Sequence, residues 1–283
     1  MENKLNEYRN LIEKELEIAL HSNSNVDSGV EQAMRYSTLG GGKRIRGILA
    51  LEFCRVFGSD VKKGLAIAAA IEMVQAFSLI HDDLPCMDDD DFRRGKPSCH
   101  KQFNEATALL AGDALLANAF NTVSSTAFLP KPHGIKPVNT VSIMSTLSNA
   151  TMEMIRGQQA DMEFESRDSI TQDEILSMYS RKTCALISAA CVCGAICADA
   201  SEKGLHKARS YGFALGMAFQ LTDDLLDLQT EKDSKKTIAT LIGEKDTAKL
   251  IKEYTDTAVK IAQNLPNGEF LETLAKELID RKN

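Results

Sequence analysis

Two clusters of aspartate residues carry the side chains of this sequence that are best suited to chemistry. The first runs from Asp82-Asp83 through Asp88 to Asp91 and holds six carboxylates within ten residues. The second, about 140 residues later, is Asp223-Asp224-Leu225-Leu226-Asp227. Two carboxylates about 4 Å apart repel by about 4 kcal/mol at an effective dielectric constant of about 20, so such clusters need protons or counter-charge. Oxygen ligands beside a phosphate group are typical of a Mg²⁺ site, which is our prediction here.

The spacing of the acids predicts how they converge. Asp223 and Asp227 are four residues apart, so on a helix they point the same way with Asp224 alongside, and two oxygens can hold one ion. A solvated acidic face is the usual alternative, but these acids alternate with leucines in an apolar helix. In the first cluster Pro85 ends the helix, so Asp88 returns from a loop and could complete a ring of oxygens.

Basic residues stand close to the acids. Arg93-Arg94-Gly95 follows the first cluster directly, either as salt-bridge partners or for bidentate capture of phosphate oxygens, which suits two adjacent guanidinium groups better. Gly40-Gly41-Gly42-Lys43-Arg44-Ile45-Arg46 spans the start of the predicted helix 43–58, whose N-terminal amides would add to the cationic side chains. This segment is not a nucleotide P-loop, because Arg44 stands where Ser or Thr would follow Gly-Lys.

Composition narrows the class of protein. The 283 residues include 43% hydrophobic but only 6% aromatic side chains, with 6 Pro and no Trp, which favours helix over sheet. A formal charge of -7 argues against a nucleic-acid partner. The polar start and the lack of a charge-free apolar run of about 18 residues predict no membrane span and a cytoplasmic location. Seven cysteines suggest reduced thiols, and Cys191, Cys193 and Cys197 are expected to be small core residues rather than metal ligands.

Apolar residues recur every three to four positions from end to end, and no Asn-Gly or Asp-Gly hairpin signal interrupts them. The simplest account is one all-α domain, although Leu129–Gly134 is the best candidate for a domain boundary. The predicted helices are 2–22, 27–37, 43–58, 61–84, 103–126, 138–165, 171–198, 202–232, 245–264 and 267–281.

Several spaced motifs occur together in one order. They are Gly41-Gly42-Lys43-Arg44-Ile45-Arg46, Ser78-Leu79-Ile80-His81-Asp82-Asp83-Leu84-Pro85, Asp88 through Pro97, Gly157-Gln158, Lys182-Thr183, and Phe219-Gln220 leading into Asp223-Asp224. With them the chain resembles the trans-isoprenyl diphosphate synthases, most closely the bacterial-type farnesyl diphosphate synthases. The resemblance covers almost the whole chain.

The resemblance implies a fold and an assembly. It implies a single all-α polyprenyl synthetase domain over residues 1–283, an isoprenoid-synthase bundle around a deep central cavity, and a homodimer. Three Mg²⁺ ions would bridge both aspartate clusters to an allylic diphosphate.

Site roles also follow from the resemblance. The expected metal ligands are Asp82, Asp83, Asp88 and Asp223, with Asp224 and Asp227 in the same catalytic set. The residues expected to engage the allylic diphosphate are Arg93, Lys182, Thr183, Gln220 and Lys236. Isopentenyl diphosphate is expected to bind Lys43, Arg46, Gln75 and Arg94.

The implied reaction is a head-to-tail condensation of isopentenyl diphosphate with dimethylallyl and geranyl diphosphates. Metal ions and cations stabilise the departing pyrophosphate, the allylic carbon becomes cationic, and the double bond of isopentenyl diphosphate attacks it. The family suggests pyrophosphate as the base that takes the final proton. No side-chain nucleophile is required.

Phe77 is predicted to set the product length. It lies five residues before Asp82, or about 7.5 Å along a helix axis, so it could form the floor of the cavity into which the product grows. In related enzymes an aromatic residue here accompanies the farnesyl (C15) product and a smaller one the geranylgeranyl (C20) product. Simple core packing of Phe77 is the alternative. A geranylgeranyl diphosphate synthase is therefore the close rival.

The chain departs from the family after Asp227, where the segment is shorter. Lys236 matches the later family lysine, while Lys232 and Lys235 are candidates for the earlier one. This shortening motivates the rival from another class, a weakly active prenyl-diphosphate-binding subunit. A terpene cyclase would share the fold but has no use for a second diphosphate site. Gly47, where proline is common, is expected to loosen the start of its helix.

Overall fold

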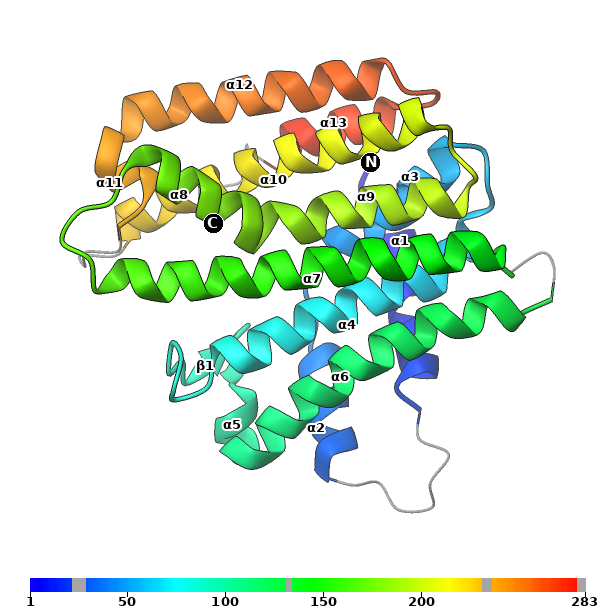
Figure 1. Ribbon diagram of the computed structural model, residues 1–283, viewed down its shortest axis with the longest axis horizontal. Coiled ribbons are helices and arrows are strands. Elements are labelled where there is room, and N and C mark those ends of the chain that lie inside the picture. The colour runs from blue at the N-terminus through cyan, green and yellow to red at the C-terminus, as the bar shows by residue number, and fades with distance from the viewer. Residues whose placement is uncertain (22–28, 131–133, 231–235, 279–283) are drawn as a thin grey trace.

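The computed structural model describes residues 1–21, 29–130, 134–230 and 236–278, and these form an all-α fold, as predicted (Figure 1). The helices are α1 (Glu2–Ala19), α2 (Gly29–Thr38), α3 (Ile45–Val56), α4 (Leu65–Asp82), α5 (Cys99–Gln102), α6 (Glu105–Ser125), α7 (Pro137–Glu165), α8 (Gln172–Tyr179), α9 (Ala185–Cys197), α10 (Glu202–Thr230), α11 (Ile238–Ile242), α12 (Glu244–Gln263) and α13 (Glu269–Glu277). Shorter elements are 3-10 turns at Val61–Gly64 and Thr126–Phe128, a π turn at Ser180–Cys184, and the strands β1 (Phe92–Arg93) and β2 (Lys96–Pro97).

Helix α9 forms the middle of the bundle, in contact with α3, α7 and α10, and α4 packs between α3, α6 and α1 (Figure 1). Eleven of the thirteen residues of α9 are buried, because the helix is apolar nearly all round. A side chain at Gly194 would place its Cβ 2.1 Å from the carbonyl oxygen of Ala50, so this glycine sets the close approach of α9 to α3. The prediction that Cys191, Cys193 and Cys197 are buried core residues is confirmed.

Two helical stretches, Val61–Asp82 and Gln172–Cys197, are long and apolar enough by composition to cross a membrane. In the bundle, 67% and 72% of their apolar windows are buried against other helices. Both are therefore accounted for as core helices, which share their composition with membrane spans.

Each predicted long helix is present within a few residues, but the β1–β2 hairpin, α5, α11 and the π turn were missed. The hairpin turn consists of Arg94 and Gly95, both with positive φ (53° and 74°), as a type I′ turn requires. Arginine is an uncommon first residue for such a turn, and the strands are only two residues long, so the usual hairpin signal is missing. The predicted helix 171–198 contains the π turn, which marks the site described next.

Candidate active site

The first aspartate cluster lies at the C-terminal end of α4. Asp82 is the last residue of the helix and Asp83 caps it, after which the chain turns back so that the Asp88 N–H donates to the Asp82 carbonyl oxygen at 2.9 Å. This return confirms the loop expected after Pro85, and it brings the exposed Asp88 within electrostatic reach of Asp82. The helix dipole is negative here, so the position disfavours carboxylates, a local conflict of the kind that is expected at functional sites.

The surroundings of Asp82 disfavour its ionised form. Burial raises its pKa to about 6, with Asp88 adding to the rise while Lys182 and Arg93 oppose it. An ionised carboxylate with this environment gains from a cation brought next to it. Lys182, which faces it from the π turn, is itself paired with Asp161 at 2.5 Å.

The position of Lys182 depends on a glycine in the opposite helix. A Cβ at Gly157 of α7 would lie 2.3 Å from the Lys182 backbone nitrogen, so only glycine lets α7 pack against the π turn. Such turns are rare and cluster at functional sites. The sequence contains Gly157 in a motif, but its isolated position within a long helix gave no indication of this contact.

Asp83 and Arg93 form an ion pair. Asp83 is 2% exposed, and its Oδ1 accepts from Arg93 Nε at 2.9 Å and from the terminal guanidinium nitrogen, which also donates to Asp90 at 2.8 Å. Burial raises the pKa of Asp83 and the guanidinium opposes that rise. The salt-bridge role considered for Arg93 is therefore real, while metal binding by Asp83 and diphosphate binding by Arg93 stay predictions that require this pair to open.

The second aspartate cluster lies on α10 and has one buried member. Asp224 is 3% exposed, and its carboxylate accepts from the Tyr179 hydroxyl at 2.7 Å and from Gln220 Nε2 at 3.2 Å. Burial raises the pKa of Asp224 to about 6, and both hydrogen bonds oppose the rise. The half-buried Asp223 lies within electrostatic reach of Arg46, and Asp227 is exposed.

Gln220 joins this cluster to the π turn. Its Oε1 accepts from the Thr183 hydroxyl at 2.7 Å, so Thr183, Gln220, Asp224 and Tyr179 form one continuous chain of hydrogen bonds. The network fixes the side chains around Lys182. Tyr179 was missed from sequence because its partner is 45 residues away.

A cavity of about 530 Å³ opens beside Asp82 between α4, α7 and the π turn. Its wall combines apolar side chains with Arg46, Gln75, Lys182 and Thr183. Gln158 also lines it and is 9% exposed, and within the described ranges neither atom of its amide group has a hydrogen-bond partner. Buried polar atoms left in this way can bond to a ligand or to water in the cavity.

Phe77 lies in the wall of the same cavity, on α4 before Asp82. Its side chain is 6% exposed and packs edge to face on His81, with ring centroids 4.9 Å apart. His81 in turn occupies the space above Gly112, where a Cβ would come within 2.2 Å of the imidazole. Phe77 is thus held firmly against the cavity, although these contacts do not test its role in product length.

A second cavity of about 520 Å³ adjoins the first and shares Arg46 and Gln75 with it. Lys43 and Arg94 complete its basic side, so the four residues predicted for isopentenyl diphosphate gather around one space. Burial lowers the pKa of Arg46, and its Nε has no hydrogen-bond partner among the residues whose positions are described. This half-buried cation, whose Nε is shielded from solvent, gains from an anion.

The glycine-rich segment gives this second cavity its shape. Gly41 and Gly42 have φ values of 98° and 127°, and a Cβ at Gly42 would lie 3.0 Å from the Arg94 guanidinium carbon. The Arg94 guanidinium donates to the Gly41 carbonyl oxygen. Only glycine therefore allows the backbone to lie against Arg94.

Gly47, which was expected to loosen the start of its helix, makes a specific contact; the loosening itself stays a prediction. The Gly47 N–H donates to Glu72 Oε1 at 2.8 Å, a bond that proline could not make, and a Cβ at Gly47 would lie 2.9 Å from Ile12 Cδ1. Glu72 also pairs with the buried Arg44 at 3.5 Å. The unusual glycine thus satisfies a buried carboxylate beneath the second cavity.

Lys236 directs its ammonium group at the carbonyl oxygens of Phe164, at 3.5 Å, and Arg167, at the C-terminal end of α7. Its predicted diphosphate contact stays a prediction. Lys232 and Lys235, the candidates for the earlier family lysine, lie outside the described residues.

A model of the polyprenyl synthetase family matches residues 27–277. The chain belongs to the polyprenyl synthetase family. Membership confirms the resemblance and places the chain among the prenyltransferases, transferases of isoprenoid biosynthesis.

Individual relatives agree with this assignment. The farnesyl diphosphate synthase of Bacillus subtilis is 37% identical over 99% of this chain and 98% of its own length. A chloroplastic geranylgeranyl pyrophosphate synthase of Capsicum annuum is 41% identical over 70% of this chain, which spans 53% of that relative. The crystal structure of an FPP/GFPP synthase from Zymomonas mobilis superposes with a TM-score of 0.90 at 30% identity, covering 98% of both chains.

Proposed function

We propose that this chain is a Mg²⁺-dependent prenyltransferase that condenses isopentenyl diphosphate head-to-tail with dimethylallyl and then geranyl diphosphate, releasing farnesyl diphosphate and pyrophosphate. One observation carries the proposal. The cavity beside Asp82 and the cavity lined by basic residues adjoin, and they share Arg46 and Gln75. Two diphosphate substrates need two such spaces side by side. A terpene cyclase, which takes one diphosphate, would have no use for the second.

The donor set fits Mg²⁺, because the available ligands are carboxylate oxygens and burial, with Asp88 adding to it, raises the pKa of Asp82 to about 6 despite Lys182 and Arg93. Asp82, Asp88 and Asp223 would hold the ions, joined by Asp83 once Arg93 leaves it. Bound there, Mg²⁺ would supply charge neutralisation for the departing pyrophosphate. The number of ions, three by family resemblance, is part of the proposal.

The side chains of the two cavities would then have separate roles. Lys182 and Arg93 neutralise the leaving diphosphate, while Thr183 and Gln220 keep the π turn in register with α10. The basic cavity orients isopentenyl diphosphate so that its double bond faces the allylic carbon. Apolar walls exclude water from the carbocation, and the released pyrophosphate takes the final proton.

The proposed product is farnesyl diphosphate, with Phe77 as the floor that limits chain growth. Its burial in the cavity wall and its support by His81 favour a rigid stop. The full-length similarity to a farnesyl diphosphate synthase favours the same product. A geranylgeranyl diphosphate synthase remains the second candidate, favoured by the similarity to the Capsicum annuum protein.

We further propose a homodimer of single-domain chains located in the cytoplasm. Large apolar side chains are exposed on α6 and α7, among them Leu110 at 53%, Met152 at 47% and Val141 at 66%. Faces of this kind mark association surfaces. Light scattering on the 31.0 kDa chain should give twice that mass, and a monomer at micromolar concentration would contradict the dimer.

The test of function is an incubation of purified protein with isopentenyl and dimethylallyl diphosphates, with Mg²⁺ or with a chelator. Chromatography of the dephosphorylated products should give farnesol as the main alcohol, and only with Mg²⁺. Geranylgeraniol as the main product would favour the second candidate. A lack of condensation with any allylic primer would reject the enzyme and favour the binding subunit.

A further inference from the structure

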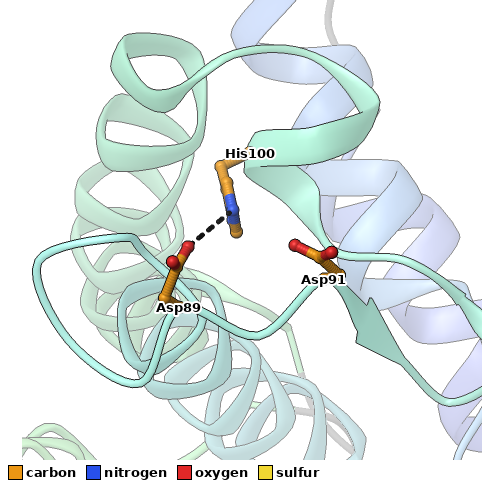
Figure 2. A group of neighbouring side chains, drawn as sticks. All are labelled: Asp89, Asp91 and His100. Carbon is orange, nitrogen blue, oxygen red and sulfur yellow. Dashed lines mark ion pairs between the residues drawn. The ribbon is translucent and has the colours of Figure 1, made fainter.

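Three side chains outside the predicted magnesium ligands converge beside the first aspartate cluster. Asp89 and Asp91 come from the loop after α4, and His100 comes from α5 (Figure 2). Their donor atoms all lie within 4.8 Å of one another. Of the parts of the chain that the structure describes, this is the one group of three or more such donors gathered so closely.

His100 is the residue of this group that has an unsatisfied ring nitrogen. The residue is 7% exposed, and its Nε2 atom has no hydrogen-bond partner within the described part of the chain. The nearest carboxylate oxygen, Asp89 Oδ1, is 3.9 Å away, too far for a hydrogen bond. His100 Nε2 is buried and lies near two carboxylates without bonding to either. The space between these three groups could hold one ion.

The other ring nitrogen of His100, Nδ1, already has a partner. Its Nδ1 lies 3.1 Å from the hydroxyl of Ser98, which is 1% exposed. A proton on Nδ1, donated to that hydroxyl, would leave the Nε2 lone pair directed at the carboxylates. A second hydrogen bond of this kind is the usual support of a metal-binding histidine.

We propose that Asp89, Asp91 and His100 form a site for a divalent transition-metal ion, of the class of Zn²⁺, Co²⁺ or Mn²⁺. One imidazole and two carboxylates suit these ions better than Mg²⁺, which takes oxygen ligands. Metal bonds of about 2.1 Å allow donor atoms to stand up to about 4.2 Å apart, and the 3.9 Å between His100 and Asp89 falls within that span. The two carboxylate side chains, 60% and 62% exposed, can turn to complete the site.

One competing contact must give way. Lys101 pairs with Asp91 Oδ1 at 2.8 Å, with both side chains more than 40% exposed. Exposed pairs of this kind are weak and are lost easily to a stronger cation. The second oxygen of the same carboxylate could also serve as the ligand while the pair persists.

A bound ion would hold the loop after α4 against α5. Asp89 directly follows Asp88, and Asp90 holds Arg93, so an ion here would tie the segment that carries both predicted active-site residues to α5. The site would therefore position the loop without contacting substrate. The inference is independent of the proposed function, because it is tested without any diphosphate.

The experiment is a titration of the full-length, chelator-stripped and reduced protein with Co²⁺ alone, followed by visible absorption and equilibrium dialysis. We expect a bound ion whose absorption shows nitrogen and oxygen ligands without a thiolate charge-transfer band. His100→Gln and Asp89→Asn should each weaken this binding on the order of tenfold or more, as loss of a ligand or its support does. His206→Gln, at an exposed histidine on α10, is the matched control and should leave the affinity unchanged.

Asp82→Asn separates the two sites, since it removes a predicted magnesium ligand and should leave this absorption unaltered. Circular dichroism of each variant establishes that it is folded, and the exposed Asp89 can be changed without opening the core. Unchanged Co²⁺ affinity in both His100→Gln and Asp89→Asn would overturn the proposal. A wild-type protein that binds no Co²⁺ would overturn it as well, and the cluster would then be only a histidine–carboxylate pair.

Discussion

The substitution Asp82→Asn should make the metal-free protein more stable while abolishing its activity. In the absence of metal the half-buried Asp82 carboxylate lies within electrostatic reach of Asp88, and partial burial raises its pKa from 3.8 to about 6. The folded state therefore favours the neutral form of this group. Asparagine supplies a neutral side chain of almost the same shape, so it removes the penalty that the wild-type protein bears at neutral pH.

The size of the effect follows from the pKa. A rise from 3.8 to about 6 corresponds to about 3 kcal/mol against the ionised form, at about 1.36 kcal/mol per pH unit. Asp82 retains contact with solvent, which screens part of this penalty, and its attraction to Lys182 is lost in the variant. We therefore expect a gain of about 1–2 kcal/mol in the free energy of unfolding, or about 2–6 °C in Tm.

The pH dependence has a defined sign. The folded pKa of Asp82 lies above its unfolded value, so ionisation destabilises the fold, and the penalty grows as pH rises from about 4 to about 6. The stability difference between variant and wild type should therefore be small near pH 4 and constant above about pH 6.5. Asp224 shows the same pKa shift but is present in both proteins, so its contribution cancels.

Denaturant titrations in the presence of a chelator measure this difference, and the same titrations with Mg²⁺ and inorganic pyrophosphate measure the linkage to ligand. At ligand concentrations of about 100 times Kd, the wild type should gain about 2.7 kcal/mol and the variant much less. Asp88→Asn, at the exposed end of the same cluster, is the comparison variant: it removes only the repulsion between the two carboxylates and should raise metal-free stability by less than Asp82→Asn does. A variant less stable than the wild type in chelator would refute the reasoning, because Asp82 would then be a structural carboxylate.

Three further substitutions test the cavities. Phe77→Ala should shift the products toward C20 and longer chains, and an unchanged C15 distribution by chromatography would show that Phe77 only packs the core. Arg46→Gln should weaken isopentenyl diphosphate binding more than allylic binding in calorimetric titrations, while equal losses would contradict two separate subsites. Gly157→Ala forces a Cβ to within 2.3 Å of the Lys182 nitrogen and should cost about 1–3 kcal/mol of stability and lower kcat on the order of tenfold; wild-type turnover would show that the π turn need not be held by α7.

The long helices could be predicted from the sequence because the apolar period of three to four residues is a local property. The β1–β2 hairpin was missed because its turn begins with Arg94, a residue that seldom adopts positive φ. The π turn was missed for a different reason. It lies inside one long predicted helix, 171–198, where sequence gives no break, and the bulge packs against Gly157 of another helix.

The site was predictable to a similar degree. The aspartates and paired arginines stand out by type and spacing, whereas Lys182, Thr183 and Gln220 were identified only through family resemblance. Tyr179 was missed because its hydrogen bond spans 45 residues, a distance over which a single sequence gives no register. His100 was missed for the same reason, since it bears on the site only through the fold of the loop before it.

A crystal structure with Mn²⁺ and an unreactive allylic diphosphate analogue tests the central claim most directly, because Mn²⁺ can be located by its anomalous scattering. We predict metal ions that bridge Asp82 and Asp88 on one side and Asp223 on the other to the diphosphate oxygens. Bound analogue with no ion between the two aspartate clusters, or ions only at the Asp89–Asp91–His100 group, would contradict it.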